Sequence, residues 1–432
     1  MANQDNSFDE FTVQSACNHV KRNAVPQNPG MNYLHGILLV IRLNEMIVTA
    51  TYICPVRGIA RLEPPDLNQM TRAAKTAKDL GLERLLVPIL EEALAGSTRA
   101  KVRYLDGLIS ALDRMADAGM KAWLIAPAQR VLGLIFLPPH LVRGGPDSQA
   151  GPVFVDGKIR NLQAYDCWKD PPYVQKRIRI FHELVDAVTG HPALSGWLVM
   201  DRALEWVRPD LEVADLALRS YLAEIRDHDE RGTIYLGLGW SELLRPEMAQ
   251  TLAQQVDGVR MSGFEKESPG LRRPKDLTTE LFVTAYLGTL AEWLFQSPIE
   301  TEIGWGALNE FRNIEGILEG TRRLSGQGIA GVNWWSLVDP ELGLLSTPPW
   351  VLVNGLEHVG LLDNHMEPKE HVEIWFRELL SSRPGEKTED FIDISLDEYL
   401  TDPVTHLPRL WEHFKESCRY HAVAGKEKSR QK

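Results

Sequence analysis

Short apolar stretches alternate with longer amphipathic segments over most of the chain. The apolar stretches have the length of buried strands, whereas the segments between them repeat their apolar positions with the period of an α-helix. This alternation is typical of parallel βα units, in which each strand is followed by a helix. It predicts eight strands, at residues 47–53, 82–89, 122–126, 196–200, 234–238, 256–261, 299–303 and 329–337.

Seven helices are predicted between these strands. Three of them are followed by Gly81, Gly119 and Gly190, as expected where a helix ends in a left-handed residue. Eight strands with intervening helices indicate an α/β protein, and their number fits a (β/α)8 TIM barrel. The predicted helices lie at residues 66–80, 101–118, 172–189, 211–227, 246–255, 277–295 and 309–324.

The barrel is predicted to cover residues 46–348, with an N-terminal extension at 1–45 and a C-terminal helical extension at 349–432. In the C-terminal extension the βα alternation stops, and two amphipathic helices are predicted at 367–380 and 407–421. We expect these helices to pack on the outside of the barrel, and we assign them no chemistry.

The longest connection between predicted elements spans residues 127–171 and is rich in glycine, proline and aspartate. It also carries aromatic side chains, among them Trp168. A loop of this length inside a compact domain is usually functional or disordered, and the aromatic residues favour a function.

The composition excludes several classes of protein. Of the 432 residues, 44% are hydrophobic and 25% are charged, so the chain can bury a large core and is neither fibrous nor disordered. The formal net charge of −12 argues against nucleic acid or an anionic membrane as a partner, because binding to phosphate needs clustered Lys and Arg. A neutral substrate is easier to reconcile with this charge.

The sequence also argues against metals, cofactors and export. The four cysteines are scattered and form no Cys-x-x-Cys pair, and neither a dinucleotide-binding glycine motif nor a P-loop is present. The N-terminus lacks the basic and apolar regions of a secretory signal. The apolar stretch 37–53 contains Arg42, Asn44 and Glu45, which would be costly in a bilayer. We therefore expect a cytoplasmic protein without metal or cofactor; its oligomeric state stays open.

Two of the predicted strands end in side chains that suit catalysis. The strand at 299–303 delivers Glu302 at its C-terminal end, and the strand at 329–337 carries two tryptophans, including Trp335. Active sites of (β/α)8 barrels lie at the C-terminal ends of the strands, so both side chains are expected there. Glu300 faces the same side as Glu302 but lies deeper, which favours a structural role.

Over roughly residues 48–339, three motifs resemble the retaining glycoside hydrolases of the large (β/α)8 clan that includes the family 5 cellulases and mannanases. Thr301-Glu302-Ile303-Gly304 matches the Thr-Glu-x-Gly pattern of strand 7 in that clan. Trp334-Trp335-Ser336-Leu337 matches the strand 8 tryptophan, and His191-Pro192 with Gly196-Trp197 matches the segment that precedes strand 4. The resemblance implies that Glu302 is the nucleophile and that Trp335 lies under the sugar in the cleaved subsite.

The chain departs from this clan at the position of the general acid/base. After Gly-Trp the clan has an Asn-Glu pair, whose glutamate is the acid/base, whereas this chain has Asp201 and Arg202. An arginine cannot donate a proton near neutral pH. The arginine that the clan carries near the end of strand 2 is also absent, since Leu86 stands there.

A second carboxyl group is nevertheless needed for hydrolysis. Retaining enzymes place the two carboxyl groups about 5 to 5.5 Å apart, and inverting enzymes about 6.5 to 9.5 Å apart. Besides Glu302, the candidates are Asp201, Glu205 and Glu265. The sequence does not decide between the two geometries, and an inverting arrangement would tolerate a displaced partner.

Other residues are candidates for substrate binding. Trp335, Trp240 and Trp168 could offer aromatic faces to sugar rings, and Arg57 could meet a hydroxyl or carboxylate of the substrate. Arg202 and Glu265 are placed in the same group. The alternative for Glu302 is a structural carboxylate that is ion-paired with Arg202 or Arg260.

Two functional hypotheses follow. The first is a glycosidase that cleaves a β-linked glycoside or oligosaccharide, with Glu302 as nucleophile and Asp201, ahead of Glu205, as acid/base. The second is a catalytically degenerate barrel that binds a glycan or serves as an interaction subunit, because function belongs to the site and not to the fold. Sugar identity, linkage and endo or exo action are not fixed by the sequence.

Overall fold

The computed structural model describes residues 46–55, 65–128, 130–131, 134–143, 152–155, 157–161, 163–164, 168–205, 208–230, 232–263, 276–304, 314–327, 329–348, 350–352, 356–381 and 390–430.

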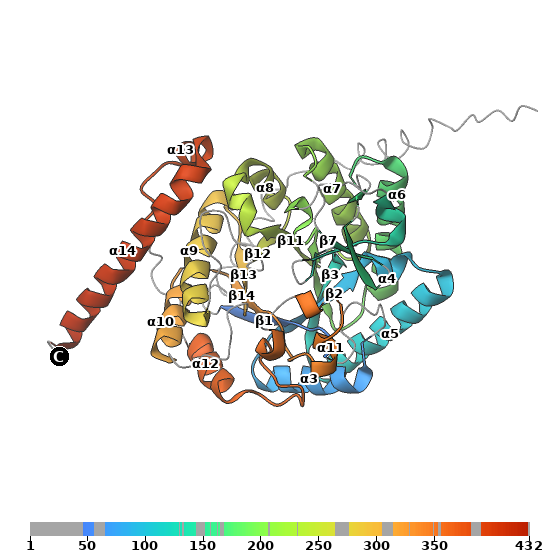
Figure 1. Cartoon of the computed structure of the whole chain (residues 1–432), viewed down its shortest axis with the longest axis horizontal. Helices are drawn as coiled ribbons and strands as arrows, with labels where there is room; N and C mark the ends of the chain where they lie inside the picture. Colours follow the sequence, from blue (N-terminus) through green and yellow to red (C-terminus); the bar gives the residue numbers. More distant parts are fainter. Residues whose placement is uncertain are drawn as a thin grey trace, which may run out of the picture. The chain divides into compact units, whose positions relative to one another are not determined.

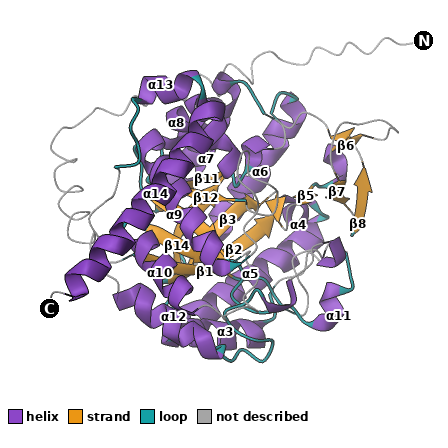
Figure 2. Cartoon of the chain, turned by 60° about the vertical axis from the view of Figure 1, so that its left-hand side comes forward, coloured by secondary structure: helices purple, strands orange, loops and turns teal. Residues whose placement is uncertain are grey.

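Eight parallel strands close into a barrel in this described part of the chain. They are β1 Ile47–Thr51, β2 Arg84–Leu90, β3 Lys121–Ala128, β10 Leu194–Val199, β11 Thr233–Gly239, β12 Gly258–Ser262, β13 Ile299–Ile303 and β14 Gly331–Trp334. Around the barrel the order is β1, β14, β13, β12, β11, β10, β3, β2, and helices surround the strands (Figure 1, Figure 2). The predicted (β/α)8 barrel is confirmed, and each strand lies within a few residues of its predicted position.

The predicted helices are also present. They are α3 Leu67–Asp79, α5 Thr98–Asp117, α6 Pro171–Val188, α7 Leu211–His228, α8 Pro246–Ala253, α9 Leu277–Phe295 and α10 Ile314–Ser325. Residues 309–313 of the last prediction lie outside the described residues. Among the described α-helices between the barrel strands, the short α4 Glu91–Ala95, which follows β2 directly, was not predicted.

Local sequence explains where several helices begin and end. The Asp66 carboxylate accepts hydrogen bonds from two backbone N–H groups at the start of α3, and the Asp276 carboxylate accepts one from the backbone N–H of Thr279 at the start of α9. Gly81, Gly119 and Gly190 follow their helices with left-handed backbones, at φ values of 89°, 68° and 79°. These three glycines therefore end their helices as predicted.

The connection between β3 and α6 contains small sheets of its own. The strands β4 Arg130–Val131, β5 Leu134–Phe136, β7 Pro152–Val155 and β8 Lys158–Asn161 form one sheet, and β6 Val142–Arg143 pairs with β9 Gln163–Ala164. Figure 2 shows β6, β7 and β8 to one side of the barrel strands. The sequence predicts only a loop here, because strands of two to four residues are too short for their alternation to be recognised.

The C-terminal segment folds into helices that contact the outer layer of the barrel. These are α12 Glu370–Ser381, α13 Leu396–Thr401 and α14 Pro403–Arg430, and the short helix α11 Leu342–Leu345 precedes them. Trp375 of α12 donates a hydrogen bond from its indole N–H to the Thr321 hydroxyl of α10, and its ring lies 4.8 Å from that of Trp334. The Tyr286 hydroxyl of α9 donates to the backbone carbonyl of Leu407 in α14. The domain boundaries remain a prediction.

Replacing Trp375 by alanine should destabilise the whole barrel. The indole is almost fully buried between α10 and the end of β14, so its loss creates a cavity and leaves the Thr321 hydroxyl without this donor. Truncations of this kind cost about 3 to 5 kcal/mol. Chemical denaturation would measure the loss. Ile374→Ala is the matched control, because Ile374 is 43% exposed and should lose less than about 1 kcal/mol. Equal losses would show that α12 does not anchor to the barrel.

Candidate active site

The interior of the barrel carries charged side chains from strand β13. Arg84 of β2 forms a salt bridge with Glu300 of β13. In the barrel order, β13 and β2 are separated by β14 and β1, so this pair crosses the interior. Glu302 is two residues further along β13 and therefore faces the same interior, nearer to the C-terminal ends of the strands.

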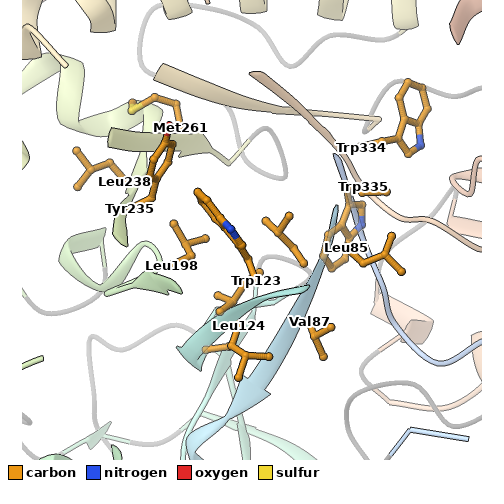
Figure 3. Close-up of a cluster of buried hydrophobic side chains, with 14 of the residues drawn as sticks. Leu85, Val87, Trp123, Leu124, Leu198, Tyr235, Leu238, Met261, Trp334 and Trp335 are labelled. Carbon is orange, nitrogen blue, oxygen red and sulfur yellow. The ribbon is translucent and has the colours of Figure 1, made fainter. Parts of the chain in front are cut away.

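Two aromatic side chains pack beside the Arg84–Glu300 ion pair. The Arg84 guanidinium lies 3.6 Å from the centroid of the Trp123 ring, and Trp123 meets Tyr235 edge to face at 4.7 Å. Figure 3 shows Trp123 and Tyr235 among the buried side chains of the barrel. Burial raises the pKa of the Tyr235 phenol, and the nearby Glu300 carboxylate acts in the same direction, so this hydroxyl stays neutral. The contacts of Glu300 agree with a structural role.

Glu302 is 4% exposed and forms a salt bridge with Arg260 of β12. The backbone of Arg260 lies opposite Glu300, while Glu302 lies opposite Asn333 of β14. Arg260 therefore reaches from one level deeper in the barrel to the carboxylate above it. Of the two partners that the sequence left open for Glu302, Arg202 and Arg260, the structure shows a salt bridge to Arg260. A guanidinium at this position favours the ionised form of Glu302.

Asp201 and Arg202 follow β10 and pack against the neighbouring strand β11. The Arg202 backbone N–H donates to the carbonyl of Gly237, at 3.0 Å. A Cβ atom at Gly237 would lie 2.5 Å from Cα of Asp201, so a larger residue cannot stand there. Both Asp201 and Arg202 are buried, and Arg202 has a left-handed backbone with φ of 53°. This backbone geometry turns the two side chains over the C-terminal ends of β10 and β11.

Arg202 forms an ion pair with Glu205 of the 3-10 turn η2 Ala203–Glu205. Its Nε and Nη2 atoms donate to Oε2 of Glu205, at 3.2 and 2.9 Å. A Cβ atom at Gly239 would lie 1.5 Å from Oε1 of Glu205, which places this carboxylate over the end of β11. The Arg202 guanidinium also lies 3.1 Å from a Cβ atom built on Gly263, at the end of β12. The carboxylate of Glu205 is thus engaged by the guanidinium of Arg202.

The three tryptophans predicted as sugar platforms are largely covered by the chain itself. Trp240 begins the 3-10 helix η3 Trp240–Leu244 and is 2% exposed, while Trp335 and Trp168 are each 5% exposed. The Arg177 guanidinium lies 5.4 Å from the centroid of the Trp168 ring. A role of these rings in binding a sugar remains a prediction. Two other predicted residues, Glu265 and Arg57, lie outside the described residues.

The structure also places carboxyl groups at the strand ends that the sequence reasoning did not consider. Glu91 and Glu92 follow β2 directly and are buried, and Glu91 forms a salt bridge of 3.2 Å with Arg177. Glu242, at the end of β11, is fully buried and accepts two hydrogen bonds from Arg208. Burial raises the pKa of Glu242 above its ordinary range, against the opposing effect of Arg208. The sequence signal that could have identified these carboxyl groups is an acidic residue within a few positions of the end of a predicted strand.

Within the described ranges, no group of three or more His, Cys, Asp or Glu side chains is arranged to hold a metal ion. The helices among these residues are too short or too polar to cross a membrane.

Comparison with known proteins gives matches in structure alone. No protein-family model and no curated protein sequence matches the chain. An exo-β-1,4-mannosidase from Opitutaceae bacterium strain TAV5 is similar with a TM-score of 0.60 and 14% sequence identity, over 77% of this chain and 58% of that one. This chain therefore spans little more than half of the mannosidase.

Two structures of a GH5_18 protein from Streptomyces cattleya are matched over more of their length. The complex with GlcNAc has a TM-score of 0.61 and 15% identity, over 79% of this chain and 82% of that one. A variant in complex with Manβ1-4GlcNAc has a TM-score of 0.60 and 15% identity, over 78% and 80%. At 14 to 15% identity, this similarity shows the fold alone. The resemblance to family 5 barrels that the motifs predict is confirmed for the fold.

Proposed function

We propose that this protein is a glycoside hydrolase that cleaves a β-linked glycoside or oligosaccharide, with Glu302 as its nucleophile. The observation that carries the proposal is the position of Glu302, a buried carboxylate paired with Arg260 near the C-terminal end of β13. Active sites of this fold lie at that end of the barrel. The barrel itself resembles those of an exo-β-1,4-mannosidase and of proteins solved with Manβ1-4GlcNAc and GlcNAc.

The proposed reaction proceeds in two steps. An oxygen of Glu302 attacks the anomeric carbon, the bond to the leaving oxygen breaks, and that oxygen takes a proton from a carboxylic acid. Water then attacks the anomeric carbon, its proton passes to the same carboxylate, and Glu302 is released. We assign the acid/base role to Asp201 ahead of Glu205, because the carboxylate of Glu205 is engaged in an ion pair with Arg202.

Turnover of simple substrates tests the proposal. The full chain would be assayed against 4-nitrophenyl β-mannoside, β-glucoside and β-galactoside, with thermal shift against β-linked disaccharides, including Manβ1-4GlcNAc, in parallel. We expect hydrolysis of at least one aryl glycoside, because its leaving group needs little protonation. Stabilisation by a disaccharide without turnover of any substrate would instead support the glycan-binding alternative, since ligands raise the melting temperature by mass action alone.

A further inference from the structure

We propose that Arg260 is the positioning residue of the site, which keeps Glu302 ionised and fixes the orientation of its carboxylate. The inference rests on the proposed glycosidase function, and it concerns a residue that none of the three family motifs contains. Arg260 belongs to β12, whereas those motifs lie at the start of β10, on β13 and at the end of β14.

The contact is built into the core of the barrel. Arg260 is 2% exposed and Glu302 is 4% exposed, and Nη2 of the arginine meets Oε2 of the glutamate. Glu300, which lies opposite Arg260 in the strand register, is paired with Arg84 from the other side of the barrel. Each of the two inward-facing glutamates of β13 thus has its own arginine partner. Arg84 forms a salt bridge with the deeper carboxylate, and Arg260 forms one with the carboxylate nearer the C-terminal ends of the strands.

The described groups on the neighbouring strands differ from Arg260 in charge or in partner. On the adjacent strands β14 and β1, the polar side chains that face inward are uncharged, and they are Asn333, Thr49 and Thr51, which hydrogen-bond to one another. Tyr235 of β11 is neutral. At the end of β10, Arg202 forms an ion pair with Glu205. Arg260 thus supplies a buried positive charge in direct contact with Glu302.

This contact matters because burial alone favours a neutral carboxyl group. A buried carboxyl without a cationic partner takes up a proton, and a protonated glutamate cannot attack the anomeric carbon. A neighbouring arginine shifts the ionisation of a carboxyl by about 1 to 3 pH units in favour of the charged form. Arg260 would thus set the lower pH limit of activity.

The pH profile of kcat/KM on an aryl β-glycoside tests the proposal. Its acid limb reports the ionisation of the nucleophile in the free enzyme. Arg260→Met should move this limb to higher pH by about 1 to 3 units and lower the maximum. Arg260→Lys keeps the charge but loses the planar fork, so the limb should stay in place while kcat falls. An unmoved limb in Arg260→Met would overturn the proposal.

Arg84→Met is the matched control, because it breaks the other buried arginine–glutamate pair of β13. It should lower the melting temperature, since it leaves Glu300 buried without its partner, but it should not move the acid limb. If Arg84→Met moves the limb as far as Arg260→Met does, the effect belongs to the charge of the whole interior. Arg260 then has no special role.

A second measurement covers the case in which Arg260→Met folds but is too unstable for a pH profile. The double variant Arg260→Met/Glu302→Gln removes both charges, so it should melt at a higher temperature than Arg260→Met alone. Melting-temperature changes that simply add would show that the two residues do not interact. The proposed function can fail independently of this inference. If Glu302→Gln retains activity, Glu302 is not the nucleophile. If Glu302→Gln is inactive but the acid limb of Arg260→Met does not move, only the role of Arg260 is wrong.

Discussion

Glu302→Gln is expected to lower kcat by about 10⁴-fold or more on any glycoside that the protein hydrolyses, because a neutral amide cannot replace a nucleophilic carboxylate. The chain should still fold, since glutamine has nearly the same shape and retains an oxygen that can accept a hydrogen bond from Arg260. Activity would be measured on the best aryl glycoside, with circular dichroism and thermal unfolding to verify the fold.

Glu300→Gln is the control for this result. Glu300 lies on the same strand and is also paired with a buried arginine, but it faces the deeper layer of the barrel beside Arg84. It should lose stability while retaining most of its activity. If both variants lose activity in proportion to their loss of stability, Glu302 is a structural group and the proposed nucleophile is wrong.

The second large effect concerns the leaving group. Because Arg202 stands where the family 5 clan carries its acid/base, we expect wild type to cleave activated aryl glycosides far better than glycosides with sugar leaving groups. General acid catalysis is worth about 10²- to 10⁴-fold, and activated leaving groups need little of it. Asp201→Asn should therefore lower kcat/KM on a disaccharide much more than on a dinitrophenyl glycoside. Steady-state kinetics on the two substrates would measure the difference.

Glu205→Gln separates the two candidate acids. Since Glu205 is engaged in an ion pair with Arg202, its amide variant should affect disaccharide and aryl glycoside to a similar extent. If Glu205→Gln rather than Asp201→Asn selectively impairs the disaccharide, Glu205 is the acid. If neither variant distinguishes the substrates, the proton comes from another carboxyl group, for which the buried Glu242 is a candidate.

The sequence predicts the barrel well because apolar runs and helical periods are local properties. The strand at 299–303 is found with its predicted bounds. The last strand is shorter than predicted, since β14 ends at Trp334, although the N–H groups of Trp335 and Leu337 still donate to the carbonyls of Ile303 and Thr51. The apolar pattern continues past β14 because these residues stay buried after leaving the regular ladder.

The site was less accessible to sequence reasoning because it depends on register and packing between distant segments. Arg260 and Glu302 are 42 positions apart, and only the strand register shows that the arginine reaches a glutamate one level above it. The pairing of Arg202 with Glu205 depends on the left-handed turn after β10. The burial of Trp240 and Trp335 likewise results from packing between segments far apart in the chain, which no local pattern encodes.

The nucleophile can be identified directly by trapping the covalent intermediate. A 2-deoxy-2-fluoro β-glycoside with a good leaving group, of the sugar that is turned over, would be incubated with the full chain, and the protein would then be digested for peptide mass spectrometry. The fluorine slows both steps, and the good leaving group lets the glycosyl-enzyme accumulate. We predict one adduct per chain, on Glu302, and none in Glu302→Gln. An adduct on another carboxylate such as Asp201, or turnover of the parent glycoside by Glu302→Gln at the wild-type rate, would contradict the account.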